Sequence, residues 1–130
     1  MSLENWDINK IRYTIVTSKI PVIVEFWMPD CRACALAEQI LTEMAEYYGE
    51  DAIFVKCRAD EYPADEANQM GLASVPFIVI NTYLEGKSDD TRGKIFGVFP
   101  SIPTKGKLIE EINAALEEID DHYGEREDSY

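Results

Sequence analysis

The chain has 130 residues, of which 46% are hydrophobic, and its formal net charge at neutral pH is −13. This length and apolar content predict a single domain with a real core, one that needs no disulfide framework, and an odd count of three cysteines suits such a framework poorly. The negative charge disfavours nucleic acid as a partner. It favours a partner with a basic docking surface, unless it serves only solubility.

The first ten residues lack the basic start, apolar stretch and small-residue cleavage site of a secretory signal. The longest apolar runs fall far short of the ~20 residues that a membrane helix needs. We therefore expect a cytoplasmic protein, monomeric and without membrane spans. In that compartment stable disulfides are rare, and paired cysteines are usually catalytic or metal-binding.

The apolar periodicity predicts helices and strands in alternation, with Asp30 capping the second helix and Gly49 following its end. The expected strands are 21–27, 52–58, 76–82 and 94–99, and the expected helices are 5–18, 31–48, 62–70 and 105–119. The first strands alternate with helices and should lie parallel, whereas the last two should pair antiparallel. The fold class is therefore α/β, with three layers around one mixed sheet.

Two polar segments stand outside this pattern. Residues 84–94 carry mixed charges and two glycines, and are expected to form a long loop between the last two strands. Residues 117–130 hold seven acids and one arginine, and the apolar stripe ends near residue 120. We expect a domain over residues 1–120 and an acidic, disordered tail over residues 121–130. Such a tail is more often a solvated end than a docking arm.

The motif that carries chemistry is Cys31-Arg-Ala-Cys34, which directly follows a buried strand and opens a helix. Two intervening residues place both sulfurs on the first helical turn, close enough to bond to each other. A helix N-terminus offers unpaired N–H groups and the positive end of the dipole, which lower a thiol pKa. A cysteine pair in this setting indicates redox chemistry.

The cysteines allow two other interpretations. One is chance placement of two small residues, which the agreement of position, spacing and preceding strand disfavours. The other is half of a zinc site, for which only Cys57 and His122 remain as further ligands and no second cysteine pair exists. We therefore expect neither a metal nor a cofactor. Cys57 itself is expected to be a buried core residue, with regulatory oxidation as the alternative.

The segment Val22-Ile-Val-Glu-Phe-Trp-Met-Pro-Asp-Cys-Arg-Ala-Cys34 resembles the active-site segment of the thioredoxin family. Val55-Lys56 followed by Asp60, and Gly71 followed by Val75-Pro76, fall at that family's spacing. The resemblance spans roughly residues 20–100. It implies a thioredoxin-like fold and a protein-disulfide reductase, whose partners are protein disulfide substrates and an upstream disulfide reductase.

The resemblance also implies a role for individual residues. Cys31 matches the attacking cysteine and Cys34 the buried resolving one. Pro76, after Val75, matches a cis-proline that faces the disulfide and shapes the substrate groove. Glu25 stands where the family has a buried aspartate that exchanges protons with the resolving cysteine.

Other residues around the motif are expected to tune the site. Lys56 matches a lysine near the buried carboxylate, although a purely structural pair of Lys56 with Glu25 is the alternative. Trp27 is equally compatible with the active-site lining and with the core. Between and before the cysteines the family usually has Gly-Pro and Trp, where this chain has Arg32-Ala33 and Asp30.

Arg32 should stabilise a Cys31 thiolate and Asp30 should oppose it, so the sequence leaves the sign of the net shift open. The redox potential and the direction of the reaction in the cell are open for the same reason. The alternative function is a thioredoxin-fold adaptor that binds partners with little redox catalysis.

Overall fold

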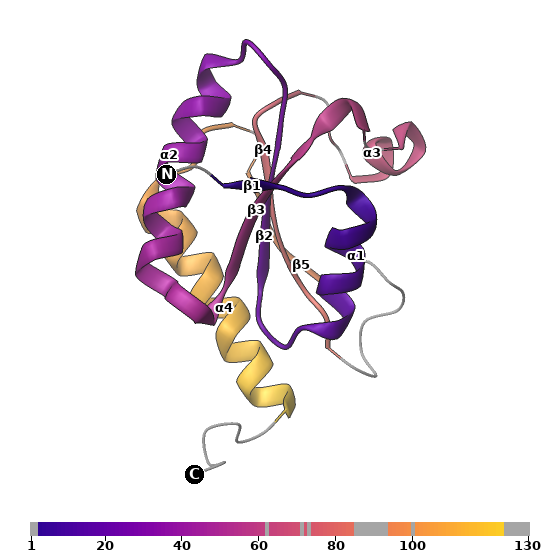
Figure 1. Cartoon of the computed structure of the whole chain (residues 1–130). Coiled ribbons are helices and arrows are strands. Elements are labelled where there is room, and N and C mark those ends of the chain that lie inside the picture. The colour runs from indigo at the N-terminus through magenta and orange to yellow at the C-terminus, as the bar shows by residue number, and fades with distance from the viewer. Residues whose placement is uncertain are drawn as a thin grey trace.

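The computed structural model describes residues 3–61, 63–70, 72, 74–84, 94–99 and 101–123 (Figure 1). Its elements, in chain order, are β1 (Glu4–Asn5), α1 (Ile8–Thr17), β2 (Val22–Trp27), α2 (Arg32–Tyr48), the 3-10 turn η1 (Gly49–Asp51), β3 (Ile53–Arg58), the 3-10 turn η2 (Ala59–Glu61), α3 (Ala64–Met70), β4 (Phe77–Thr82), β5 (Lys94–Phe99) and α4 (Lys105–Tyr123). In these residues no helix is long and apolar enough to cross a membrane.

The strands form one mixed sheet in the order β1-β3-β2-β4-β5. β2 pairs with β3 in parallel and with β4 antiparallel, and β5 pairs antiparallel with β4. This arrangement confirms the predicted α/β class and the predicted change of strand direction. The four main strands lie within two residues of the predicted ranges.

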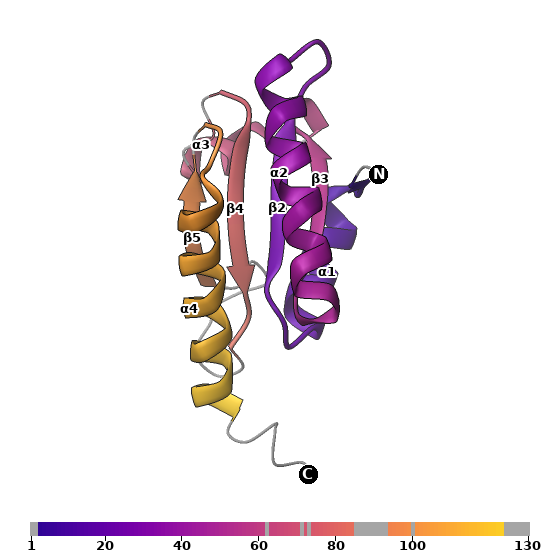
Figure 2. The same cartoon turned by 90° about the vertical axis from the view of Figure 1, so that its left-hand side faces the viewer.

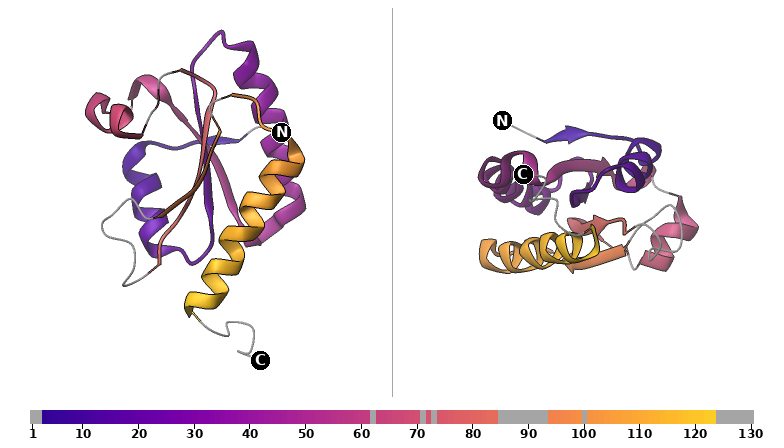
Figure 3. Two further views of the ribbon diagram at one scale, coloured as in Figure 1. Left: turned by 180° about the vertical axis from the view of Figure 1, so that it is seen from behind. Right: turned by 90° about the horizontal axis from the view of Figure 1, so that it is seen from below.

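Helices cover both faces of the sheet, so the domain has three layers. α2 and α4 lie on one face, and α1 and α3 lie on the other (Figures 1 and 2). The view from below shows the sheet between the two helical layers (Figure 3). Alternate residues of β2 serve the two faces: Ile23 packs with Leu41 and Ile112 on the α2/α4 side, and Val24 packs with Ile15 on the α1 side. β2 is buried on both faces, as its continuous apolar run predicts.

Besides shifts of one or two residues, three features of the helix ends differ from the sequence prediction. Helix α1 begins at Ile8 because Asp7 accepts a hydrogen bond from the Lys10 amide at 2.8 Å, and this leaves residues 4–5 free to form β1. Asp30 does not cap α2. It has a φ of +62°, in the left-handed region that Asp tolerates better than most residues, and the cap is the next residue, Cys31.

The third difference is at the C-terminal end of α4. The helix continues to Tyr123, so the boundary expected at residue 120 falls inside it. The Tyr123 hydroxyl donates to the Tyr83 carbonyl at 3.2 Å, and Lys19 Nζ lies 4.8 Å from the Tyr123 ring centre. These contacts give the last turn partners that its sequence pattern does not reveal. The rest of the expected tail, residues 124–130, and loop residues 85–93 lie outside the described residues.

Candidate active site

The cysteine motif forms the first turn of α2, as predicted. Cys31 is the N-cap, and its Sγ accepts a hydrogen bond from the Cys34 amide at 3.0 Å. Cys31 and Cys34 are joined by a disulfide, with their Cα atoms 5.2 Å apart. The sulfur therefore occupies the place that a capping oxygen takes at other helices, where it faces the N–H groups of the first turn. This location favours a thiolate on Cys31 once the disulfide is reduced.

The two cysteines differ in exposure. Cys31 is half-buried at the end of the helix, whereas the exposed fraction of Cys34 is 4%. A disulfide partner that approaches from solvent can therefore reach the Cys31 sulfur and not the Cys34 sulfur. This asymmetry is what an attacking and a resolving cysteine require.

The bond between Val75 and Pro76 is cis, as the family resemblance implies. Pro76 is buried and Val75 is half-buried, directly before β4 begins. Because β4 runs antiparallel to β2, with Phe77 opposite Phe26, the start of β4 lies at the same end of the sheet as the end of β2. The chain thus brings Val75–Pro76 and the cysteine loop to one edge of the domain.

Glu25 is fully buried in the middle of β2 and is on the sheet face that α2 covers. Neither of its carboxylate oxygens has a hydrogen-bond partner among the described residues. Burial raises the pKa of Glu25 to about 8, and the nearby Glu38 carboxylate adds to the rise, while Lys56 opposes it. The burial agrees with the buried carboxylate that the family resemblance implies at this position.

Lys56 neighbours Glu25 across the β2–β3 pair but is bonded elsewhere. Its Nζ donates to both oxygens of Glu38 on α2, at 3.1 and 3.2 Å. Glu38 Oε2 also accepts from the Leu3 amide at 2.9 Å. The alternative interpretation, a purely structural pair of Lys56 with Glu25, does not hold, since the carboxylate that bonds Lys56 is Glu38.

Glu38 completes this polar cluster, and it is not among the site residues predicted from the sequence. A signal for it was present, because Glu38 is four residues after Cys34 and therefore lies on the same face of α2, one turn further along. That face is otherwise apolar, with Ala37 and Leu41 fully buried. An acid beside a buried stripe indicates a cation on the facing sheet, and half-buried Lys56 is that cation.

Trp27 ends β2 beside the active-site loop and is half-buried. Its indole N–H donates to Asn5 Oδ1 of β1 at 2.8 Å, and Lys56 Nζ lies 4.7 Å from its ring centre. Trp27 therefore connects Asn5 of the edge strand β1 to the Lys56 ammonium group. It does not belong to the apolar core.

The remaining predicted tuning residues lie around the cysteines. Asp30 and Arg32 are exposed on either side of Cys31, and Ala33 is half-buried behind it. The opposite charges of Asp30 and Arg32 are both exposed to solvent, where screening weakens their electrostatic effect on Cys31.

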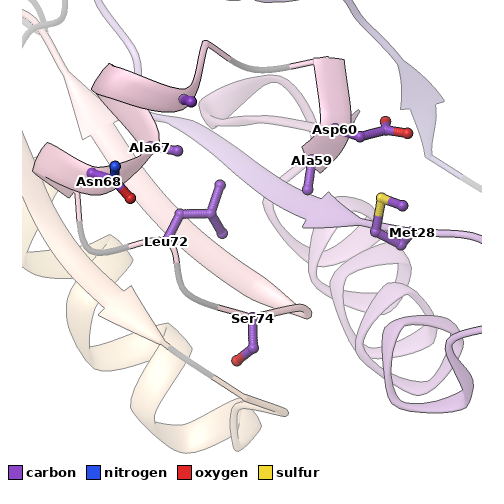
Figure 4. Close-up of a pocket in the computed structure, with 8 residues that line it drawn as sticks. Met28, Ala59, Asp60, Ala67, Asn68, Leu72 and Ser74 are labelled. Atoms are coloured by element: carbon purple, nitrogen blue, oxygen red, sulfur yellow. The ribbon is translucent and has the colours of Figure 1, made fainter.

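A cavity of about 420 Å³ opens next to this site (Figure 4). It extends from Met28, just before the active-site loop, to Ser74, just before Val75. Leu72 points into it, and Asp60 and Asn68 provide polar groups at its margin (Figure 4). The cavity has a mixed apolar and polar lining.

Cys57 does not take part in the site. It is fully buried among the residues on the α1 face of the sheet, opposite to the face that carries Glu25. Burial raises the pKa of its thiol to about 11, with smaller effects from Glu61 and Asp7, so the thiol is unreactive at neutral pH. In the described part of the chain no group of three His, Cys, Asp or Glu side chains is placed to hold a metal ion.

Comparison with known proteins agrees with this geometry. The family model described as thioredoxin matches residues 6–96. Thioredoxin 1 of Synechococcus elongatus is 35% identical over 77 residues, which cover 59% of this chain and 69% of that protein. Chloroplastic thioredoxin M4 of Arabidopsis thaliana is 33% identical over 96 residues, which cover 74% of this chain and 46% of that protein.

Solved structures show the same fold at lower identity. Chloroplastic thioredoxin z superposes with a TM-score of 0.70 and 21% identity, over 88% of this chain and 95% of that one. Oxidised mitochondrial thioredoxin 3 of Saccharomyces cerevisiae gives a TM-score of 0.64 and 20% identity, over 86% and 94% of the two chains. Together with the matched family model and the bonded cysteine pair, these findings place the chain in the thioredoxin family, as a thiol–disulfide oxidoreductase whose redox pair is Cys31 and Cys34.

Proposed function

We propose that in the cell the chain works in the reducing direction, passing electrons from an upstream disulfide reductase to disulfides of target proteins. The observation that carries this proposal is the pairing of a reachable Cys31 sulfur with a buried Cys34 sulfur on one helical turn. An attacking thiol must meet a large protein partner, whereas a resolving thiol must stay shielded until the mixed disulfide has formed.

The reaction proceeds in two exchanges. The Cys31 thiolate attacks one sulfur of the target disulfide, a bond forms between Cys31 and the target, and the other target sulfur leaves as a thiolate that takes up a proton. Cys34 then attacks the Cys31 sulfur, and the second target thiolate leaves and is protonated. Two electrons pass from the Cys31–Cys34 dithiol to the target, which gains two thiols, and the upstream reductase restores the dithiol.

We assign to Glu25 the acceptance of the proton that Cys34 loses in the second exchange. Three features support this role: Glu25 is buried, it is on the sheet face covered by the helix that carries Cys34, and its pKa is raised to about 8. A thiol has an ordinary pKa near 8.5. A base whose pKa is close to that of the proton donor exchanges protons efficiently near neutral pH.

The proposal places the target chain against Val75–Pro76 and the cavity between Met28 and Ser74. The adjacent position of the cavity supports this placement. The net charge of −13 supports a basic surface on the target or the reductase, because opposite charges steer encounter. The proposal also includes a monomer in the cytoplasm, where a cellular reductant is at hand; sedimentation and cell fractionation test these two points.

Reduction of insulin by a catalytic amount of the protein, with dithiothreitol as reductant, tests the proposed activity. We expect turbidity from the released insulin B chain to develop faster with wild type than with dithiothreitol alone, and Cys31→Ser to return the rate to that background. An adaptor would leave the rate at background in both cases. That outcome would refute the proposal.

A further inference from the structure

We infer that Glu38 is a positioning residue for the proton transfer at Glu25: it holds the Lys56 ammonium against α2 and away from the Glu25 carboxyl. This inference rests on the proposed function in one respect, the assignment of Glu25 as the proton acceptor for Cys34. The placement of the three side chains is independent of that assignment.

The sheet register places Lys56 where it could pair with Glu25. The two residues are partners on the neighbouring parallel strands β2 and β3, and both are on the α2/α4 face of the sheet. Partner side chains on one face of a sheet lie close enough to interact, and a lysine stem is long and flexible. A lysine at this position can therefore pair either with Glu25 on the neighbouring strand or with Glu38 on α2.

The hydrogen bonds show which carboxylate Lys56 contacts. Its Nζ bonds both oxygens of Glu38, while both oxygens of Glu25 are without a hydrogen-bond partner in the described residues. Glu38 is fixed in turn by the Leu3 amide before β1, and Lys56 also contacts the Trp27 ring. The ammonium group of Lys56 is thus held by Glu38 on α2 and by the Trp27 ring at the end of β2, and a side chain held in that way does not move freely to Glu25.

The other groups that face Glu25 carry no charge that could take the place of Glu38 or Lys56. β4 contributes Ile78, its partner across the strand pair, and the buried residues of α4 on this face are apolar. From α2 the titratable groups are Glu38 and the cysteine pair, which is oxidised in this structure. The two charges that decide how readily Glu25 holds a proton are therefore Glu38 and Lys56, and they act in opposite directions.

The consequence for the reaction concerns the pH at which Cys34 can be deprotonated. With Lys56 held away, Glu25 keeps a proton affinity close to that of a thiol. With Lys56 released, Glu25 would ionise at lower pH and become a weaker base. Glu38 would in this way set the working pH of the second exchange through the position of Lys56.

The experiment is an NMR titration of the Glu25 side-chain carboxyl carbon in the oxidised protein, which needs no turnover. We expect Glu38→Gln to lower the titration midpoint by about one pH unit, a shift typical of a change in one close charged partner. Glu38→Asp, which withdraws the carboxylate by one methylene, should move it less in the same direction. The matched control is Glu43→Gln on the same helix, whose exposed carboxylate pairs with Lys105 and should leave the midpoint unchanged.

A double-mutant cycle separates positioning of Lys56 from the charge of Glu38 itself. If Glu38 acts through Lys56, the shift caused by Glu38→Gln should shrink to less than about half in a Lys56→Met background. An equal shift in both backgrounds, or no shift in either, would overturn the inference.

The kinetic counterpart is the pH profile of the second exchange, measured as release of a thiol from a Cys31 mixed disulfide. Its midpoint should move with the NMR midpoint in Glu38→Gln and be absent in Glu25→Gln. A profile that stays fixed while the NMR midpoint moves would contradict the role of Glu25 and leave the position of Lys56 established. Failure of wild type to reduce insulin would instead count against the proposed function.

Discussion

Glu25 interrupts an otherwise apolar strand, and the cost of burying it shapes the pH dependence of folding. Its pKa rises from 4.5 to about 8 on folding, chiefly because burial disfavours the charged form. The folded state therefore binds a proton more tightly than the unfolded state at every pH between these values. It follows that this residue makes the free energy of unfolding fall as the pH rises from about 5 to about 8.

Glu25→Gln should remove this fall. The amide has the same shape and stays neutral, so the variant should gain stability relative to wild type as the pH increases. The difference should reach several kcal/mol near pH 8, since each pKa unit corresponds to about 1.4 kcal/mol. Urea unfolding of both proteins at several pH values provides the measurement, and parallel pH curves would show that Glu25 is not buried as a neutral acid.

For single residues, burial could be predicted from the sequence, whereas the choice of an ion-pair partner could not. Glu25 could be predicted as a buried acid because its neighbours on the strand are all apolar, and the outcome agrees. The partner of Lys56 could not be chosen between Glu25 and Glu38, because that choice depends on how far α2 lies from the sheet and on the Leu3 amide. Both are tertiary properties, which strand alternation and helical periodicity do not contain.

At the scale of elements, the long periodic segments were predictable and the short or anchored ones were not. β1 has two residues, too few to show an alternation of apolar and polar side chains. It forms because it pairs with the edge of β3. The cap of α2 was assigned to Asp30 on residue preference, whereas the backbone turns sharply at that residue and passes the cap to Cys31. At this position the backbone conformation of the active-site loop, and not the capping preference of Asp30, determines where α2 begins.

The end of α4 is the element-scale case that can be tested. Tyr123→Phe removes the hydroxyl that donates to the Tyr83 carbonyl while keeping the ring beside Lys19. We expect a loss of about 0.5–1.5 kcal/mol, the usual net value of one such hydrogen bond. Amide hydrogen exchange should also accelerate in the last turn of α4 and not at Leu108. Unchanged exchange in that turn would mean that the helix needs no anchor there.

At the scale of the whole molecule, the sheet and its two helical layers serve to bring distant segments to one edge. The cysteine loop follows β2, Val75–Pro76 precedes β4, and the antiparallel pairing of these strands makes the two segments meet. The sequence predicted this juxtaposition through the order of strands and the family resemblance. It could not predict the adjacent cavity, whose walls come from the loop after β2, η2, α3 and the loop before β4.

The central claim for the molecule is that Cys31 attacks a target disulfide and Cys34 resolves the product. Trapping on insulin tests it most directly, with mass spectrometry to locate the adduct. Cys34→Ser should form a covalent complex through Cys31 that survives denaturant and is released by dithiothreitol, while Cys31→Ser should form none. If Cys34→Ser forms no complex and wild type reduces no insulin, the chain is not a thiol–disulfide oxidoreductase of the kind described.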